Sequence, residues 1–549
     1  MDRYARRSLG PIRRFLTLVA ASAIIIGMVG QGASQAASSA HTQQSVAAHI
    51  LKTKAGQLMT APARAFLERV ARGERAGGPE QGSNALAKLK VSSGGVNAPT
   101  GTLTNVRVND PGADSHQIDQ TTQSETAIAV AGSNVVVGWN DSQQSLQPFF
   151  TAASNLNGYG YSSNGGGTWT DGGVIPNAPA QNNVGDPWLA SDRAGNFYYA
   201  SLVIDFFSNS LGIGVAKSTD GGKTFSAPVT ASPTGGFFYF GDKDAMTVGP
   251  DPSTKSRDDI YVAWDDSACD QTACFNGLPV AHSTDGGATW QLAYADRFIF
   301  DDTTGCSFQQ YIGAQPLVDP KDGTLYVAAE RFAVSDPLCD GSGTFTMDES
   351  IFKSTDGGKT FGSRVVIATV TPAFAQGFMD LGPGLVMRTI EFPTLALFKG
   401  ALYAAWNDGA SGNSHIRLAK STNGGASWQL SWASQGTNDE VQPALSSDNA
   451  ALHLLFYQRN PDNTLGVIAA NSSNGSAFVQ RTATSRSFPG VLTVPQFDPL
   501  IAFGYMGDYI ANVSDGTHQY FAWGDNRDRV ANYLWPDGRN DPNVYFARQ

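Results

Sequence analysis

Acidic and amide side chains recur immediately ahead of β-type runs along this sequence. The residues that line up at one position of these runs are Glu125, Asp186, Asp244, Gln315, Gln442 and Asp508, with Glu391 one residue out of register. Glycoside hydrolysis needs two carboxyl groups roughly 5 to 10 Å apart, one as acid and the other as base or nucleophile. We therefore predict catalytic carboxyls at Asp186, Asp244 and Glu125, then at Asp508 and Glu391, with Gln442 as a substrate-binding amide.

A purely structural interpretation of these acids is also open. Acids that begin inner strands often accept backbone hydrogen bonds, and the strand ends Trp139-Asn140-Asp141 and Trp406-Asn407-Asp408 could lock neighbouring sheets together. Several carboxylates in one concave mouth repel each other, however, unless a sugar, a cation or a basic partner joins them. We expect no cofactor. Calcium at the acidic mouth is the alternative, although no loop of the EF-hand pattern is present.

The elements that must position these residues are marked by a repeated octet. Its copies are SSNGGGTW at 162–169, STDGGKTF at 218–225, STDGGATW at 283–290, STDGGKTF at 354–361 and STNGGASW at 421–428. A short Asp or Asn side chain can accept hydrogen bonds from the backbone, and glycine tolerates positive φ. The octet is therefore predicted to be a hairpin turn whose closing Trp or Phe anchors the next strand.

Four β-type runs accompany each octet, three before it and one after it. In the third unit they are 245–248, 260–264, 278–282 and 290–293. A sixth unit has a decayed octet at 472–478, and a seventh has only three runs, so the run at 103–108 is predicted to complete it. We predict an all-β, seven-bladed β-propeller of four-stranded blades, closed by this N-terminal strand. Six blades with an appended hairpin is the alternative.

The octets resemble the Asp-box (S-x-D-x-G-x-T-W, also called the BNR repeat) of sialidase-like propellers, over about residues 102–549. The resemblance implies a propeller, and sialidases use three arginines for the sialate carboxylate, an Asp acid/base and a Tyr-Glu nucleophile pair. If that scheme holds, the arginines on the predicted face are Arg388, Arg459 and Arg527, with Tyr509 as the phenolic nucleophile. The sequence lacks the Arg-Ile-Pro motif of sialidases. Similar boxes occur in xyloglucanases, sortilin-type receptors and photosystem assembly factors.

The N-terminus predicts export. Five arginines precede or flank an apolar run at 15–30, followed by Ser34-Gln35-Ala36, which is typical of a secretory signal spanning 1–36. Residues 37–101 are predicted to be a leader or linker, partly disordered or helical, with an amphipathic helix at 61–75 in which Phe66, Leu67 and Val70 share a face. Four cysteines in an exported chain predict disulfides that pair Cys269 with Cys274 and Cys306 with Cys339.

Charge and motifs exclude several function classes. Removing residues 1–36 takes away five Arg and one Asp, so the formal charge moves from −11 to −15, which argues against nucleic acid. The sequence has neither H-E-x-x-H nor G-x-S-x-G. We expect a secreted, monomeric glycoside hydrolase that acts on an extracellular glycan and has no stable membrane span. The alternatives are a non-catalytic propeller that binds glycan or protein, and an envelope assembly factor.

Overall fold

The computed structural model describes residues 43–52, 59, 61–73, 103–113, 122–142, 154–233, 237–270, 273–300, 307–335, 343–374, 377–434, 436–492, 506–531 and 536–549. The predicted signal at 1–36, together with Cys306 and Cys339, lies outside these residues. Within them, no helix is both long and apolar enough to cross a membrane.

Among the described residues, five antiparallel sheets have four strands each, and four of these sheets pair their strands in chain order, as the octet spacing predicts. The first is β2 (Gln123–Ala131), β3 (Asn134–Asp141), β4 (Asn157–Ser162) and β5 (Thr170–Val174). The next is β15 (Phe308–Val318), β16 (Leu325–Ser335), β17 (Thr344–Ser354) and β18 (Val365–Thr369). Another is β21 (Thr394–Phe398), β22 (Ala401–Asp408), β23 (His415–Ser421) and β24 (Gln429–Trp432). The last of the four is β25 (Glu440–Ser447), β26 (Leu452–Arg459), β27 (Leu465–Ser472) and β28 (Val479–Thr482).

The second and third units merge into one nine-stranded sheet, because β11 forms a parallel bridge to β9 at Phe240 and Leu211. Its first part is β6 (Gln181–Asn183), β7 (Trp188–Ser191), β8 (Phe197–Asp205), β9 (Ser210–Ser218) and β10 (Val229–Thr230). Its second part is β11 (Phe238–Pro250), β12 (Asp258–Cys269), β13 (Cys274–Ser283) and β14 (Gln291–Phe300). These last four strands are much longer than predicted, since aromatic residues 238–240 continue β11 beyond the octet unit.

In the final sheet an N-terminal strand pairs with the last strand of the chain, as predicted. Its order is β1 (Val106–Arg107), β32 (Arg539–Arg548), β31 (Gln519–Val530) and β30 (Ala511–Ser514), with Val106 opposite Phe546. The described elements also include a small sheet of β19 (Phe378–Asp380), β20 (Leu385–Arg388) and β29 (Val491–Leu492), and a short 3-10 helix, η1 (Pro111–Ala113).

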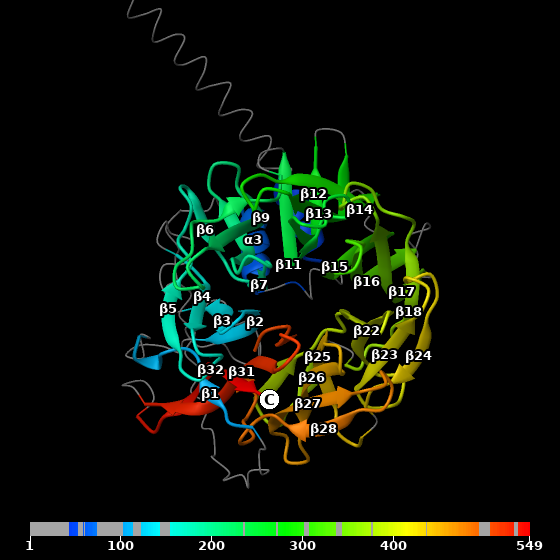
Figure 1. Ribbon diagram of the computed structural model, residues 1–549. Helices are drawn as coiled ribbons and strands as arrows, with labels where there is room; N and C mark the ends of the chain where they lie inside the picture. Colours follow the sequence, from blue (N-terminus) through cyan, green and yellow to red (C-terminus); the bar gives the residue numbers. More distant parts are fainter. Residues whose placement is uncertain are drawn as a thin grey trace, which may run out of the picture.

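The sheets surround a common centre (Figure 1). Their innermost strands are in contact in the order β2, β7, β11, β15, β21, β25, β30 and again β2. First and last sheets also meet through the first octet. The Trp169 ring lies 5.0 Å from that of Phe546 in an edge-to-face arrangement, and Arg548 Nη1 donates to the Gly165 carbonyl at 3.0 Å.

Each octet is a tight turn held by its own side chains. In the third copy, Ser283 Oγ donates to Asp285 Oδ1 at 2.8 Å and accepts from the Gly287 N-H at 2.9 Å. Asp285 also accepts from Thr289 Oγ1 at 2.6 Å and from the Thr289 N-H at 2.9 Å. The Thr289 hydroxyl is the largest cause that lowers the pKa of Asp285 to about 2. Gly286 and Gly287 take φ of 74° and 86°, so the predicted turn chemistry is confirmed.

Replacing Asp285 by alanine is expected to lower the free energy of unfolding by about 1–3 kcal/mol, because several donors lose their acceptor. Asp285→Asn should cost much less. The fifth octet has Asn423, whose Oδ1 accepts from Ser421 Oγ at 2.9 Å and the Ser427 N-H at 3.0 Å. Denaturant unfolding of both variants checks this, and equal losses for Asn and Ala would contradict it.

The N-terminal segment packs against the long strands of the merged sheet. Residues 43–50 are helical, and α3 spans Ala61–Ala71, which confirms the predicted amphipathic helix. Phe66, Leu67 and Val70 are buried, as their shared face predicts. They lie in one hydrophobic cluster with Phe238, Phe240 and other residues of β8, β11 and β12.

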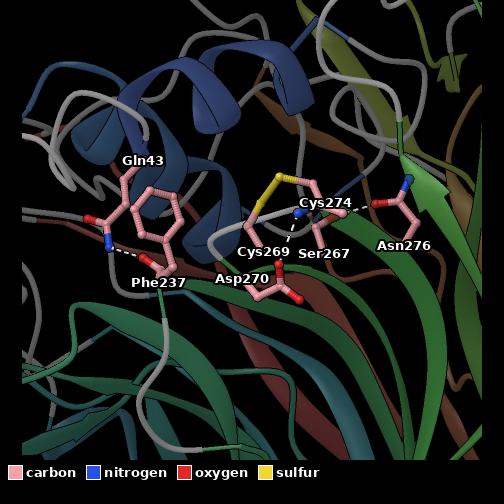
Figure 2. Close-up of a disulfide and its surroundings, with 8 residues drawn as sticks. Gln43, Phe237, Ser267, Cys269, Asp270, Cys274 and Asn276 are labelled. Carbon is pink, nitrogen blue, oxygen red and sulfur yellow. Dashed lines mark hydrogen bonds between the residues drawn. A yellow bond between two sulfur atoms is a disulfide. The ribbon is translucent and has the colours of Figure 1, made fainter.

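The predicted disulfide between Cys269 and Cys274 is confirmed. It joins opposite residues at the hairpin end of β12 and β13 (Figure 2). Cys269 shares the hydrophobic cluster of the N-terminal helices, whose ribbon crosses above the disulfide in Figure 2. The cross-link thus closes the hairpin end beside the docked segment.

Candidate functional site

A β-bulge interrupts several inner strands near the centre of the ring. The register shifts between Ser124 and Ala127, Asp242 and Ala245, Ile312 and Gln315, and Val441 and Ala444. The first residue inside each bulge has positive φ, and these residues are Glu125 (51°), Lys243 (52°), Gly313 (66°) and Gln442 (52°). Asp186 has φ of 55° just ahead of β7.

The β-bulges show that the predicted alignment of the inner strands is wrong in β11 and β15. Lys243, not Asp244, occupies the position of Glu125 in β11, and Gly313, not Gln315, occupies it in β15. A bulge adds one residue to a strand, so the alternation of side chains used for the alignment fails at that point. Lys243 was missed for this reason. The signal that could have found it is the basic residue within Gly241-Asp242-Lys243-Asp244.

Lys243 lies at the centre of a buried group of charges. Its Nζ is 3.1 Å from Glu125 Oε1 and 3.8 Å from Asp186 Oδ2, and it forms an ion pair with Asp508. Only 2% of the Lys243 side chain is exposed. We call Glu125, Asp186, Lys243, Arg388 and Asp508 the ionic cluster. Three of the predicted acids, Glu125, Asp186 and Asp508, therefore meet here, and Lys243 is a cation that relieves their repulsion.

Backbone and amide contacts link the ionic cluster across several sheets. Arg388 Nε donates to Asp508 Oδ1 at 2.7 Å, and the Asp508 N-H donates to Glu125 Oε1 at 2.9 Å. Asn140 Nδ2 donates to Glu125 Oε2 at 2.5 Å, and its Oδ1 accepts from the Asp186 N-H at 2.8 Å. Asn140, at the end of its strand, thus links Glu125 to Asp186, which is the structural role predicted for this residue.

The carboxyls of the site differ in protonation. Burial acts to raise the pKa of Asp508, but the charges of Arg388 and Lys243 outweigh it and lower that pKa below its ordinary value. Burial raises the pKa of Asp244 well above its ordinary value, with Asp242 adding to the shift. Burial raises the pKa of Asp186 as well, although Lys243 opposes this. Asp508 is therefore ionised under conditions in which Asp244 is protonated. General acid and base catalysis requires one carboxyl group in each of these two states.

A cavity of about 340 Å³ runs along the inner strands. At one end, which we call the upper end, it is lined by Lys243, Asp244, Gln442, Asp508 and Tyr509. At the other, the octet end, it is lined by the last residues of the inner strands, among them Val130, Ser191, Val248 and Val513. Both carboxyl oxygens of Asp244 are buried, and neither has a hydrogen-bond partner among the described residues. An incoming hydroxyl or glycosidic oxygen could satisfy them.

Aromatic and amide residues complete the upper end of the cavity. Tyr509 OH donates to the Pro187 carbonyl at 3.0 Å, and its ring lies 5.3 Å from that of Trp188. Gln442 Nε2 donates to the Gly507 carbonyl at 2.8 Å and to the Arg388 carbonyl at 3.1 Å. Lys243 Nζ lies 5.6 Å from the centroid of the Phe392 ring. Trp188 and Phe392 are partly exposed and line the cavity.

The three predicted arginines and Glu391 each have a separate partner. Arg459 pairs with Asp439, Arg527 pairs with Asp525, and Arg388 pairs with Asp508, so the three arginines do not meet at one carboxylate. Glu391 Oε1 accepts from the Ala373 N-H at 3.2 Å. Burial is the largest cause that raises the pKa of Glu349 in β17, and the charge of Glu391 adds to it. Among the described residues, no group of three or more His, Cys, Asp or Glu could hold a metal ion.

The protein is expected to lose stability as the pH rises from 4.5 towards 7. Burial is the largest cause that raises the pKa of Asp259 to about 6 and those of Asp266 and Glu440 to about 7. A group whose pKa is raised on folding stabilises the folded state below its unfolded pKa, and that stabilisation is lost as the pH rises through the folded pKa.

We therefore expect the free energy of unfolding to fall by about 1–3 kcal/mol over this range. Burial lowers the pKa values of His282 and His453, which act in the opposite direction but are fewer. Urea unfolding at a series of pH values checks the sign, and a stability that rises towards pH 7 would show that the histidines dominate.

No family model matches the sequence, and no curated protein matches it. Solved structures that the chain resembles include the endosialidase of phage phi92, at 11% identity, over 82% of this chain and 69% of that chain, with a TM-score of 0.41. An α-L-arabinanase from Penicillium chrysogenum shows 14% identity over 65% of this chain and 92% of that chain, with a TM-score of 0.38. A Hadza microbial sialidase shows 16% identity over 72% and 74%, with a TM-score of 0.38. The hydrogen-bonded octets described above resemble the Asp-box of sialidase-like propellers.

Proposed function

We propose that this chain is a secreted glycoside hydrolase, built as a seven-bladed β-propeller, that cleaves an extracellular glycan at the upper end of its cavity. The observation that carries the proposal is the pair of carboxyls with opposite pKa shifts, Asp244 and Asp508, lining one end of a 340 Å³ cavity. Such a cavity has the size of a small-ligand pocket. The blade count is supported by the seven innermost strands, each of which contacts the next around the ring.

Each carboxyl has a role that follows from its protonation. Asp244, kept protonated by burial, would donate a proton to the leaving oxygen. Asp508, kept ionised by Arg388 and Lys243, would act as the base or nucleophile. Glu125 and Asp186 contact the Nζ of Lys243 and so position the lysine that holds Asp508. Glu125 and Asp186 would therefore act only through Lys243. The glycosidic bond that is cleaved would lie in the cavity.

The cavity wall suits a sugar. Trp188 and Phe392 present partly exposed aromatic rings near the acids, and aromatic faces stack on the apolar faces of sugars. Much of the remaining lining is apolar, and its polar residues, which include Thr247, Gln315, Thr394 and Asn512, could orient hydroxyl groups.

A non-catalytic glycan-binding propeller is the second candidate. It is favoured by the burial of the ionic cluster, in which the side chains of Glu125, Asp186 and Asp508 are 0% exposed. In that case the charges would hold the sheets together, and the cavity would only bind. Kinetic measurement separates the two candidates.

The test is a screen of the purified chain on fluorogenic glycosides, including a sialoside and an arabinofuranoside, beside the Asp244→Asn variant. We expect release of fluorophore from at least one substrate by the wild type and a large loss in the variant. Asp285→Asn, altered in an octet turn that does not line the cavity, is the matched control. Glycan binding with no hydrolysis would favour the second candidate instead.

A further inference from the structure

Lys243 and Arg388 are the cations of the ionic cluster, and carboxylates already occupy both of them. Lys243 Nζ has three N-H donors. It lies 3.1 Å from Glu125 Oε1 and 3.8 Å from Asp186 Oδ2, and it forms an ion pair with Asp508. Arg388 Nε donates to Asp508 Oδ1 at 2.7 Å, and Nη2 pairs with the other oxygen of the same carboxyl. A negatively charged sugar would have to displace a buried carboxylate from either cation.

The third nitrogen of the Arg388 guanidinium is engaged as well. Nη1 donates to the Met59 carbonyl at 2.5 Å. Arg388 is 5% exposed and is not among the residues that line the cavity. Arginine recognises a carboxylate best through two parallel N-H donors, and Arg388 already makes that pair with Asp508. The arginine therefore serves the proposed base and not an incoming anion.

The charges that line the cavity balance each other. Burial raises the pKa of Asp244 and keeps this acid neutral, so the charged pair among the described lining residues is Lys243 and Asp508. Burial acts to raise the pKa of Asp508 too, but Arg388 and Lys243 outweigh it. A sugar carboxylate beside Asp508 would meet a like charge away from water, next to cations that are already paired. This penalty falls on anionic sugars and not on neutral ones.

Two buried side chains at the upper end hold acceptor oxygens that a sugar hydroxyl would satisfy. Gln442 is 3% exposed, and its Nε2 donates to the carbonyls of Arg388 and Gly507, which identifies the other amide atom as the oxygen. This Oε1 is buried and has no hydrogen-bond partner among the described residues, as is true of both carboxyl oxygens of Asp244. A hydroxyl group can donate to such oxygens, whereas a carboxylate or a sulfate brings only acceptors.

We propose that the upper end of the cavity selects an uncharged sugar, whose hydroxyl groups donate hydrogen bonds to Gln442 Oε1 and Asp244. An apolar face of the sugar stacks on Trp188 or Phe392, which line the same cavity. Neutral pentosides and hexosides belong to this class, and sialosides, uronides and sulfated sugars do not. The inference rests on the proposed function for the position of the sugar, and it makes Gln442 a residue that determines specificity.

The first test compares sugars that differ in charge alone. The full chain is assayed on fluorogenic glucosides and glucuronides and on galactosides and galacturonides, together with an arabinofuranoside and a sialoside. We expect turnover of uncharged sugars, with kcat/KM about 10²-fold lower or less for every anionic counterpart, because a polar group left unpaired in a built site is strongly rejected. Turnover of an anionic sugar at a rate equal to or above that of its neutral counterpart, or of the sialoside alone, would overturn the inference and leave the hydrolase proposal standing.

Binding of free sugars separates this inference from the hydrolase proposal. Ligand-observed NMR with glucose and glucuronate, galactose and galacturonate, and arabinose needs no catalysis. We expect a neutral sugar to bind at least about tenfold more tightly than its anionic counterpart. Neutral sugars that bind while no glycoside is cleaved would support the inference and remove the hydrolase proposal. Failure of every neutral sugar to bind would contradict the inference.

A pair of variants at one lining residue tests the charge argument. Gln315→Lys adds a cation to the cavity wall, and Gln315→Met is the matched neutral control of similar length. The lysine should raise the affinity for the anionic sugar relative to the neutral one by about tenfold or more, because an unpaired opposite charge is then available. Methionine should leave this ratio unchanged. An equal ratio in the two variants would show that charge does not select the sugar.

Gln442→Leu tests the proposed hydrogen bond to Oε1. The variant should weaken binding of the neutral sugar by about tenfold. One monodeoxy analogue, which lacks the hydroxyl that donates to Oε1, should bind the variant and the wild type equally. If every monodeoxy analogue loses as much affinity as the parent sugar, Gln442 acts on the fold and not on the sugar, and its assignment is wrong.

Discussion

Replacing Lys243 by methionine is expected to lower the free energy of unfolding by about 3–5 kcal/mol, the cost of breaking a buried ion pair. The variant leaves Glu125, Asp186 and Asp508 buried around an apolar side chain, with only Arg388 to balance Asp508. These carboxyls would have to take up protons in the folded state. The loss should therefore be larger at pH 8 than at pH 5.

The matched control for this prediction is Lys217→Met. Lys217 is partly exposed, with its Nζ 5.3 Å from the centroid of the Tyr198 ring, so its loss should cost less than about 1 kcal/mol. A second variant, Asp508→Asn, combined with Lys243→Met, should cost less than the sum of the two single changes. Full additivity, or a Lys243→Met protein as stable as the wild type, would show that the ion pairs do not hold the centre together.

Asp244→Asn is expected to reduce kcat about 10²- to 10⁴-fold on a natural glycoside, because an amide cannot donate the proton that the leaving oxygen needs. The loss should be much smaller on a substrate with an activated phenolic leaving group, which departs without protonation. Asp508→Asn should reduce both rates, since the base or nucleophile is needed whatever the leaving group. Stopped assays on the two substrate classes measure this difference.

The pH–rate profile gives an independent check of these roles. The wild-type rate should fall on the alkaline side as Asp244 ionises, and Asp244→Asn should remove that fall while leaving the acidic side unchanged. Asp285→Asn, which keeps the cavity residues, should retain the wild-type profile. If Asp244→Asn and Asp508→Asn lose activity equally on both substrates, the assignment of Asp244 as the acid is wrong.

The octets show that much of the fold can be predicted from short segments of the sequence. Ser283, Asp285, Gly287 and Thr289 lie within seven residues, and the four hydrogen bonds described above for this turn join members of this short segment. Because such contacts need no distant partner, the pattern predicts the turn, the strands on either side of it and their order. The incomplete last unit predicts the closing strand β1 by the same reasoning, since unpaired strand edges are avoided.

The site required information that no short segment holds. The repeat was enough to predict acids at one end of a ring of sheets, because their places in it recur. Which of these acids meet depends on long-range packing, since the bulge in β11 brings Lys243 among them and leaves Asp244 facing the cavity. The contact between Met59 and Arg388 likewise depends on tertiary packing: it joins residues 329 positions apart, and it rests on the burial of apolar side chains and not on any local pattern.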